Sequence, residues 1–167
     1  MGMDSRARFE LLYARHAAAV KAYALRRADA ASADDVVAEV FVVCWRRLDE
    51  LPAEELPWLF GVARRVLSTQ RRGERRRAAL GERLARAAPP GQESAERALG
   101  DALSCLADGD RELLLLVAWE GLSPNEAALA LGVKPSTARV RLMRARRRLA
   151  AALTNERSAA PAAAEVW

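Results

Sequence analysis

Aromatic residues and isoleucine are scarce in this chain of 167 residues: Phe, Trp and Tyr together make up 5% of it, and isoleucine is absent. Because aromatic and β-branched residues favour strands, there are too few strand formers for a sheet protein. Alanine, leucine and arginine, which are good helix formers, dominate instead. The composition therefore predicts an all-α fold.

Cysteine, histidine and long apolar runs are also scarce. Cys44 and Cys105 are too few for a disulfide framework, and the single histidine, His16, leaves no recognised spacing of metal ligands. The longest apolar run, Leu113 to Trp119, is too short to cross a bilayer, and the first residues lack the apolar core of a signal peptide. We expect a cytoplasmic protein with no metal, no cofactor and no membrane insertion.

Charge is distributed in alternating blocks. Residues 1–60 carry 8 basic and 10 acidic groups, residues 61–100 carry 10 and 4, residues 101–133 carry 1 and 6, and residues 134–167 carry 8 and 2. Two separate basic segments suggest two places where a polyanion could dock. A pair of solvated basic helices is the alternative interpretation of either block.

Apolar residues at helical spacing predict two small helical domains joined by a flexible linker. The first, residues 1–72, should contain three helices, with Ser32 as the N-cap of the second and Pro57 at the first position of the third. Residues 73–92 lose the periodicity and are expected to form the linker. The second domain is predicted over residues 93–153, followed by a disordered tail over residues 154–167.

The second domain contains the most informative stretch, LSPNEAALALGVKPSTARVRLMRARRRL. Ser123 and Glu126 have the spacing of a capping box, so a helix should begin between them. Gly132 can adopt the positive φ that a sharp turn needs, and Pro135 then opens another helix. This spacing predicts a helix-turn-helix, whose second helix is free of acidic residues and exposes arginines suited to duplex DNA.

The first domain carries acidic and aromatic residues on its second helix: Asp34, Asp35, Glu39, Phe41 and Trp45. Such a surface suggests a protein partner. Paired carboxylates also occur in metal and acid-base sites, but no histidine, further carboxylate or glycine-rich loop accompanies these. We therefore do not expect an enzyme.

Three ordered motifs resemble the extracytoplasmic-function (ECF) sigma factors, a family of RNA polymerase sigma factors. DDVVAEVFVVCWRRL is similar to their polymerase-binding helix, and PWLFGVARRVL to their promoter-melting segment. AWEGLSPNEAALALGVKPSTARVRLMRARRRL is similar to their domain that reads the −35 element. The resemblance implies a transcription initiation factor that binds core RNA polymerase and promoter DNA, with an anti-sigma factor as a further partner, and that is nucleoid-associated when bound to polymerase.

The resemblance also implies three sets of contact residues. The set for core polymerase consists of the five acidic and aromatic residues Asp34, Asp35, Glu39, Phe41 and Trp45. The set for an unstacked base and the backbone of the −10 element is Trp58, Phe60, Arg64 and Arg65, although an equally weighted alternative places both aromatic residues in the core. In the −35 set, Arg139, Val140, Met143 and Arg144 read bases, with Ser136, Thr137 and Arg141 near phosphates.

Two other functions compete with this interpretation. A helix-turn-helix transcriptional regulator that acts without core polymerase would bind a symmetric operator as a dimer. An interaction protein that regulates another sigma factor would not need its own arginines to read DNA.

Overall fold

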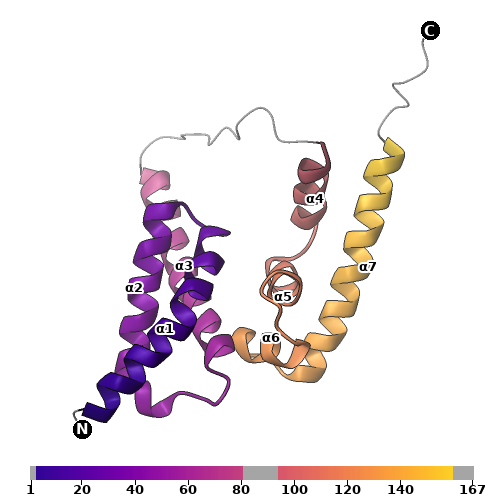
Figure 1. Cartoon of the computed structure of the whole chain (residues 1–167). Coiled ribbons are helices and arrows are strands. Elements are labelled where there is room, and N and C mark those ends of the chain that lie inside the picture. Colours follow the sequence, from indigo (N-terminus) through magenta and orange to yellow (C-terminus); the bar gives the residue numbers. More distant parts are fainter. Residues whose placement is uncertain (1–2, 81–93, 160–167) are drawn as a thin grey trace. The chain divides into compact units, whose positions relative to one another are not determined.

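The computed structural model describes residues 3–80 and 94–159, and it confirms the all-α prediction for this part of the chain (Figure 1). Its helices are α1 (Met3–Leu25), α2 (Ala30–Arg46), α3 (Glu55–Leu80), α4 (Ser94–Ser104), α5 (Asp108–Ala118), α6 (Pro124–Leu131) and α7 (Pro135–Ala159), with a short 3-10 turn at Leu48–Glu50. The chain divides into two compact units: one holds α1, α2 and α3 with Leu129–Gly132 at the end of α6, and the other holds α4, α5, the first part of α6, and α7.

The amino-terminal unit is a bundle in which α1, α2 and α3 pack against one another. Its core is formed by apolar side chains that recur every three or four residues on each helix. The largest fully buried ones are Val20, Tyr23, Val36, Val40, Cys44, Leu59 and Phe60. A polar contact joins α1 to the start of α3, because Nε2 of the buried His16 lies 3.0 Å from Oε2 of Glu55.

Two helix starts differ from the predictions. The N-cap of α2 is Asp29, whose carboxylate accepts a hydrogen bond of 2.9 Å from the backbone N–H of Ser32. Ser32 thus lies inside the first turn, because an aspartate three residues earlier caps as well as serine does. Helix α3 begins at Glu55, so Pro57 occupies its third position, where no intrahelical donor is required either.

Two helices also run further than predicted. Helix α3 continues to Leu80, so residues 73–80 of the predicted linker are helical. Helix α7 continues to Ala159, so residues 154–159 of the predicted tail are helical. The first extension is rich in Arg and Ala, whose helix propensity sustains a helix after the apolar stripe has ended, whereas the second prolongs the long helix α7 by less than two turns. Residues 81–92 of the linker and 160–167 of the tail lie outside the described residues.

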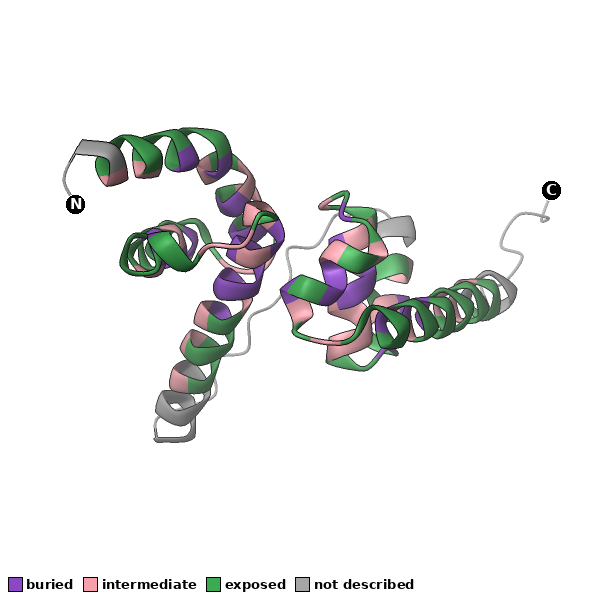
Figure 2. Ribbon diagram, turned by 90° about the horizontal axis from the view of Figure 1, so that it is seen from below, coloured by how far each residue is buried: buried purple, intermediate pink, exposed green. Residues whose placement is uncertain are grey.

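In the carboxy-terminal unit α4 and α5 both pack against α7. Helical spacing predicts that Ala138, Leu142, Ala145 and Leu149 of α7 face inward; the first three are buried, as are Leu113 and Leu116 of α5, and Leu149 is half-buried. Figure 2 shows the outer face of α7, the long helix that leads to the carboxy-terminus, as exposed. Among the described residues, no helix is both long and apolar enough to cross a membrane.

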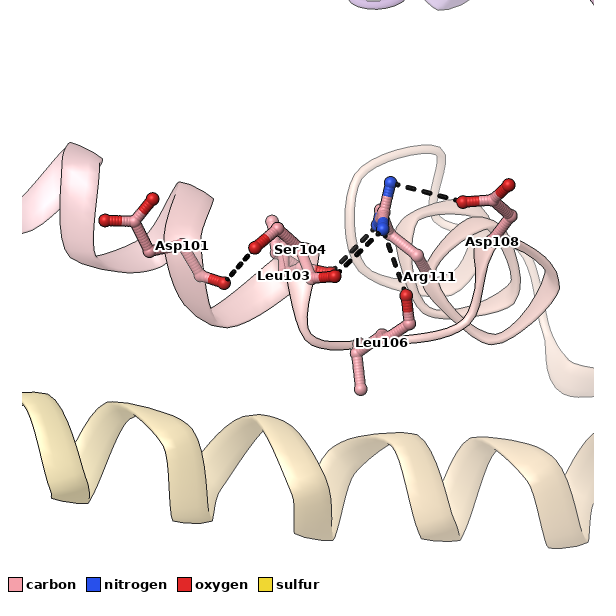
Figure 3. Close-up of polar contacts among 6 residues, drawn as sticks. All are labelled: Asp101, Leu103, Ser104, Leu106, Asp108 and Arg111. Atoms are coloured by element: carbon pink, nitrogen blue, oxygen red, sulfur yellow. Dashed lines mark hydrogen bonds and ion pairs between the residues drawn. The ribbon is translucent and has the colours of Figure 1, made fainter.

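Arg111 fastens the turn between α4 and α5 (Figure 3). Its Nε donates to the carbonyl of Leu103 at 2.8 Å, and its Nη2 donates to the carbonyls of Ser104 and Leu106 at 3.3 and 3.0 Å. Its Nη1 also lies 3.5 Å from the carboxylate of Asp108. The planar guanidinium thereby satisfies carbonyl groups at the end of α4 that have no partner within that helix.

We predict that Arg111→Met lowers the free energy of unfolding of the carboxy-terminal unit by about 2 kcal/mol, because charged hydrogen bonds to part-buried carbonyls are lost while the apolar stem is kept. Hydrogen exchange of the α4 and α5 amides measures the effect. Arg148→Met, on the exposed face of α7, should change stability by less than about 0.5 kcal/mol. Unchanged protection of α5 in Arg111→Met would contradict the role assigned to this arginine.

Candidate functional site

The carboxy-terminal unit forms the predicted helix-turn-helix from α6 and α7. At the start of α6 the backbone N–H of Ser123 donates to the Glu126 carboxylate at 2.7 Å, and the N–H of Glu126 donates to the Ser123 hydroxyl at 3.2 Å. These two reciprocal bonds confirm the capping box. They fix the first turn of the helix that precedes α7.

The turn after α6 is closed by Gly132, whose φ is +67° as the sequence predicts. The N–H of Val133 donates to the carbonyl of Ala128 at 3.0 Å, and the N–H of Gly132 donates to the carbonyl of Leu129 at 3.1 Å. This pair of bonds is the Schellman motif, which needs a left-handed residue at its centre. The direction in which α7 leaves α6 is therefore set by backbone geometry.

Most of the predicted −35 residues lie on the exposed surface of α7. Val140 and Met143 are apolar yet 44% and 52% exposed, and arginines lie on either side of them. Apolar side chains exposed between cations suit a surface that meets both base edges and phosphates. The exposed members of this set are Ser136, Thr137, Arg139, Val140, Met143 and Arg144, and the exposed Arg146, Arg147 and Arg148 continue the basic surface along the helix.

Arg141 differs from the other predicted −35 residues, because it points back into its own unit. Its Nε lies 2.7 Å from Oδ1 of Asp110 on α5, and the two side chains are only 32% and 15% exposed. A Cβ atom at Gly109 would lie 2.5 Å from Nη2 of Arg141, so the guanidinium occupies space that any larger residue would take. The expected phosphate contact of Arg141 is thus replaced in this structure by an internal ion pair.

Arg139 has a partner of a different kind. Its Nη2 donates a hydrogen bond of 3.0 Å to the side-chain carbonyl of Asn125 on α6, and both side chains are exposed. A neutral amide leaves the charge of the guanidinium in place. This pair could not be predicted from sequence spacing, since the two residues are 14 positions apart on different helices.

The amino-terminal unit exposes an aromatic cluster, which we define as Phe9, Tyr13, Phe41 and Trp45. The rings pack edge to face, with centroids 5.2 Å apart for Phe9 and Trp45 and 4.6 Å apart for Tyr13 and Phe41. Trp45 and Tyr13 are 49% and 46% exposed, whereas Phe41 is 4% exposed and belongs to the core beneath them. Of the two aromatic residues predicted on α2, only Trp45 is therefore available to a partner.

The acidic residues predicted on α2 are all exposed, as a contact surface requires: Asp34, Asp35 and Glu39. Asp34 accepts an ion pair of 2.8 Å from Lys21 of α1, and this interaction raises the pKa of Lys21 above its usual value. Two further exposed side chains were not among the predicted contacts. The helical spacing of Tyr13 places it on the apolar stripe of α1, and Val42, 49% exposed, lies within the motif of α2 but is neither acidic nor aromatic.

The predicted −10 residues do not form one accessible group. Phe60 is 2% exposed and stacks on the buried Tyr23 with centroids 4.9 Å apart, so it belongs to the core and is not free to stack on a base. Arg27 in turn lies 3.6 Å from the centre of the Tyr23 ring. Trp58 and Arg64 are half-buried, and Arg65 is exposed.

The described ranges contain no cluster of three or more histidine, cysteine or acidic side chains that could hold a metal ion. Burial, and then the negative charge of Glu55, raise the pKa of the Cys44 thiol to about 11. This thiol is therefore protonated at neutral pH.

Comparison with known proteins identifies both units. Residues 12–77 match the family model of Sigma-70 region 2, and residues 96–149 match that of Sigma-70 region 4. The chain is 34% identical over 143 residues to the ECF RNA polymerase sigma factor SigL of Mycobacterium tuberculosis, covering 78% of this chain and 80% of SigL. It is 30% identical to the RNA polymerase sigma factor NccH of Alcaligenes xylosoxydans xylosoxydans, covering 72% of each.

A third relative is much longer than this chain. The match to the protein named probable RNA polymerase sigma factor RfaY, of Xanthomonas campestris, is 36% identical over 132 residues and covers 71% of this chain but 33% of RfaY.

Two solved structures share the helical fold. The sigma factor RpoE of Bartonella quintana, solved with the anti-sigma factor NepR, superposes with a TM-score of 0.63 at 24% identity, covering 87% of this chain and 96% of RpoE. CnrH, solved with the cytosolic domain of CnrY, superposes with a TM-score of 0.57 at 29% identity, covering 88% of each chain.

The capping box predicts a titration that can be measured. Hydrogen bonds with the Ser123 side chain, and then with its backbone N–H, hold the pKa of Glu126 below its usual 4.5. A lowered pKa in the folded state means that Glu126 stabilises the fold above the unfolded pKa and that this contribution is lost as pH falls through the folded pKa. We expect Ser123→Ala to move the pKa of Glu126 back toward 4.5, measured by NMR of the carboxyl carbon; an unmoved pKa would contradict this cause.

Proposed function

This chain belongs to the ECF group of the sigma-70 family of RNA polymerase sigma factors, and we propose that it binds core RNA polymerase and directs it to promoters with two separated DNA elements. In this proposal the amino-terminal unit binds the polymerase and reads the −10 element, while the helix-turn-helix reads the −35 element. The chain performs no catalytic step of its own, because the polymerase supplies the chemistry. It acts in the cytoplasm, on the nucleoid when bound to polymerase.

The observation that carries the proposal is the presence, in one chain, of the region 2 match over an exposed aromatic cluster and the region 4 match over a basic helix-turn-helix. A regulator that acts without polymerase would need only the basic helix-turn-helix. In our proposal Trp45 is the centre of the polymerase contact, and further exposed residues of α1 and α2 complete it: Tyr13, Val42, Asp34, Asp35 and Glu39. Phe41 supports this surface from the core.

For the −10 element we propose Trp58, Arg64 and Arg65 as contact residues, near the loop that joins α2 to α3. The exposed guanidinium of Arg65 suits the phosphate backbone, and the half-buried indole of Trp58 can border a captured base. Phe60 contributes from the core by fixing α3 against Tyr23.

For the −35 element we propose base contacts by Arg139, Val140, Met143 and Arg144, with Ser136 and Thr137 near phosphates. Arg141 holds α7 in place through Asp110. Residues 1–72 and 93–153 then act as two tethered binding modules, whose linkage raises the effective concentration of the second contact once the first has formed.

An anti-sigma factor is the further partner in this proposal. The aromatic cluster leaves apolar rings exposed in the free chain, and such a patch favours a bound partner when polymerase is absent. The relative CnrH was solved with a protein partner, the cytosolic domain of CnrY.

We predict that Trp45→Ala weakens the binding of this chain to core RNA polymerase about 30-fold, because exposed tryptophans at the centre of interfaces are frequent hot spots. Affinity for core enzyme, measured by fluorescence anisotropy, tests this prediction. Trp45→Phe should keep most of the affinity. Leu25→Ala removes another exposed apolar side chain of the same unit and should leave the affinity unchanged. Equal loss in Trp45→Ala and Leu25→Ala would argue against a contact centred on Trp45.

The whole function is tested by transcription with core polymerase from a library of promoters. We expect initiation that depends on both elements, and we expect Arg139→Ala and Arg144→Ala each to reduce the preference for the −35 sequence by about 5-fold to 150-fold, the range for one bidentate contact between arginine and guanine. A chain that neither binds polymerase nor initiates transcription would refute the proposal.

A further inference from the structure

We propose that Asn125 is a positioning residue that holds Arg139 ready for a guanine in the −35 element. This inference rests on the proposed function, and it adds a residue of α6 to the determinants of promoter sequence. The contact behind it is the hydrogen bond of 3.0 Å from Nη2 of Arg139 to Oδ1 of Asn125.

The acceptor is held by a rigid part of the fold. Asn125 is the second residue of α6 and lies between Ser123 and Glu126, whose reciprocal hydrogen bonds fix this turn. The left-handed Gly132 and the bonds around it then fix where α7 begins. The capping box therefore anchors the turn that holds Asn125, and the backbone bonds around Gly132 anchor the start of the helix that carries Arg139.

The hydrogen bond to Asn125 leaves Arg139 able to bind a further ligand. A guanidinium has five N–H donors, and the bond to Asn125 uses one of them. The amide is neutral, so the full positive charge remains, and guanine N7 and O6 need only two donors. Arginine otherwise loses considerable rotamer freedom when it binds, and a side chain that is already ordered avoids part of that loss.

Arg141 on the same helix shows the contrasting arrangement. Its partner is the carboxylate of Asp110, which neutralises its charge, and the pair is largely shielded from solvent. Arg139 has a neutral partner and remains exposed. Arg141 therefore stabilises the fold, whereas Arg139, two positions away, is ordered but still available to DNA.

The experiment uses the full chain bound to core polymerase and selects from duplex promoters with a randomised −35 element. We expect wild type to enrich guanine at one position and Arg139→Ala to lose that preference. Asn125→Ala should reduce the guanine preference at the same position by about twofold to tenfold, the effect of leaving one long side chain unordered, with the other positions unchanged. Asn155→Ala, which removes an exposed asparagine further along α7, is the matched control and should resemble wild type.

Two results would overturn the inference while leaving the proposed function intact: Asn125→Ala could keep the full guanine preference, or it could lower affinity equally at all positions. The second result would mark a purely structural role, and the melting temperature of each variant checks that the unit remains folded. An unchanged preference in Arg139→Ala would overturn the inference together with the base contact that the proposed function assigns to Arg139. Failure of the wild-type holoenzyme to enrich any sequence would instead refute the proposed function, and the inference with it.

Discussion

The orientation of α7, which decides which of its faces is exposed, depends on the ion pair between Arg141 and Asp110. This bond of 2.7 Å joins the helix to α5 in a setting where the carboxylate is 15% exposed. A charge-assisted hydrogen bond is strong there, and the loss of either partner would leave the other charge poorly solvated. Arg141 therefore keeps the apolar stripe of α7 turned toward α5 and, as a result, turns Val140 and Met143 outward.

The arginines of α7 thus have different tasks although they look alike in the sequence. Arg141 is fixed by a carboxylate, Arg139 is ordered by an amide, and Arg144 and Arg147 lie on the exposed face. A helix that only attracted phosphates would need no such distinction, because every cation would serve the same purpose. Differences in ordering among neighbouring cations are what a sequence-reading surface requires.

Local features of the fold could be predicted from the sequence, because their causes lie within a few residues. The capping box at Ser123, the left-handed Gly132 and the inward face of α7 all depend on short spacings, and all were correct. The inward turn of Arg141 could not be predicted, since it depends on where α5 packs. The burial of Phe60 needed knowledge that Tyr23 lies beside it, and the exposure of Tyr13 needed the packing of α1 on α2.

The position of Gly109 restricts which substitutions this chain can accept during evolution. The guanidinium of Arg141 occupies the space that a Cβ at position 109 would need. An added methyl group would oblige the far end of the Arg141 side chain to move, and with it the guanidinium that pairs with Asp110. A descendant of this chain that gains a side chain at position 109 must therefore turn this guanidinium aside, whereas the backbone around it can stay in place.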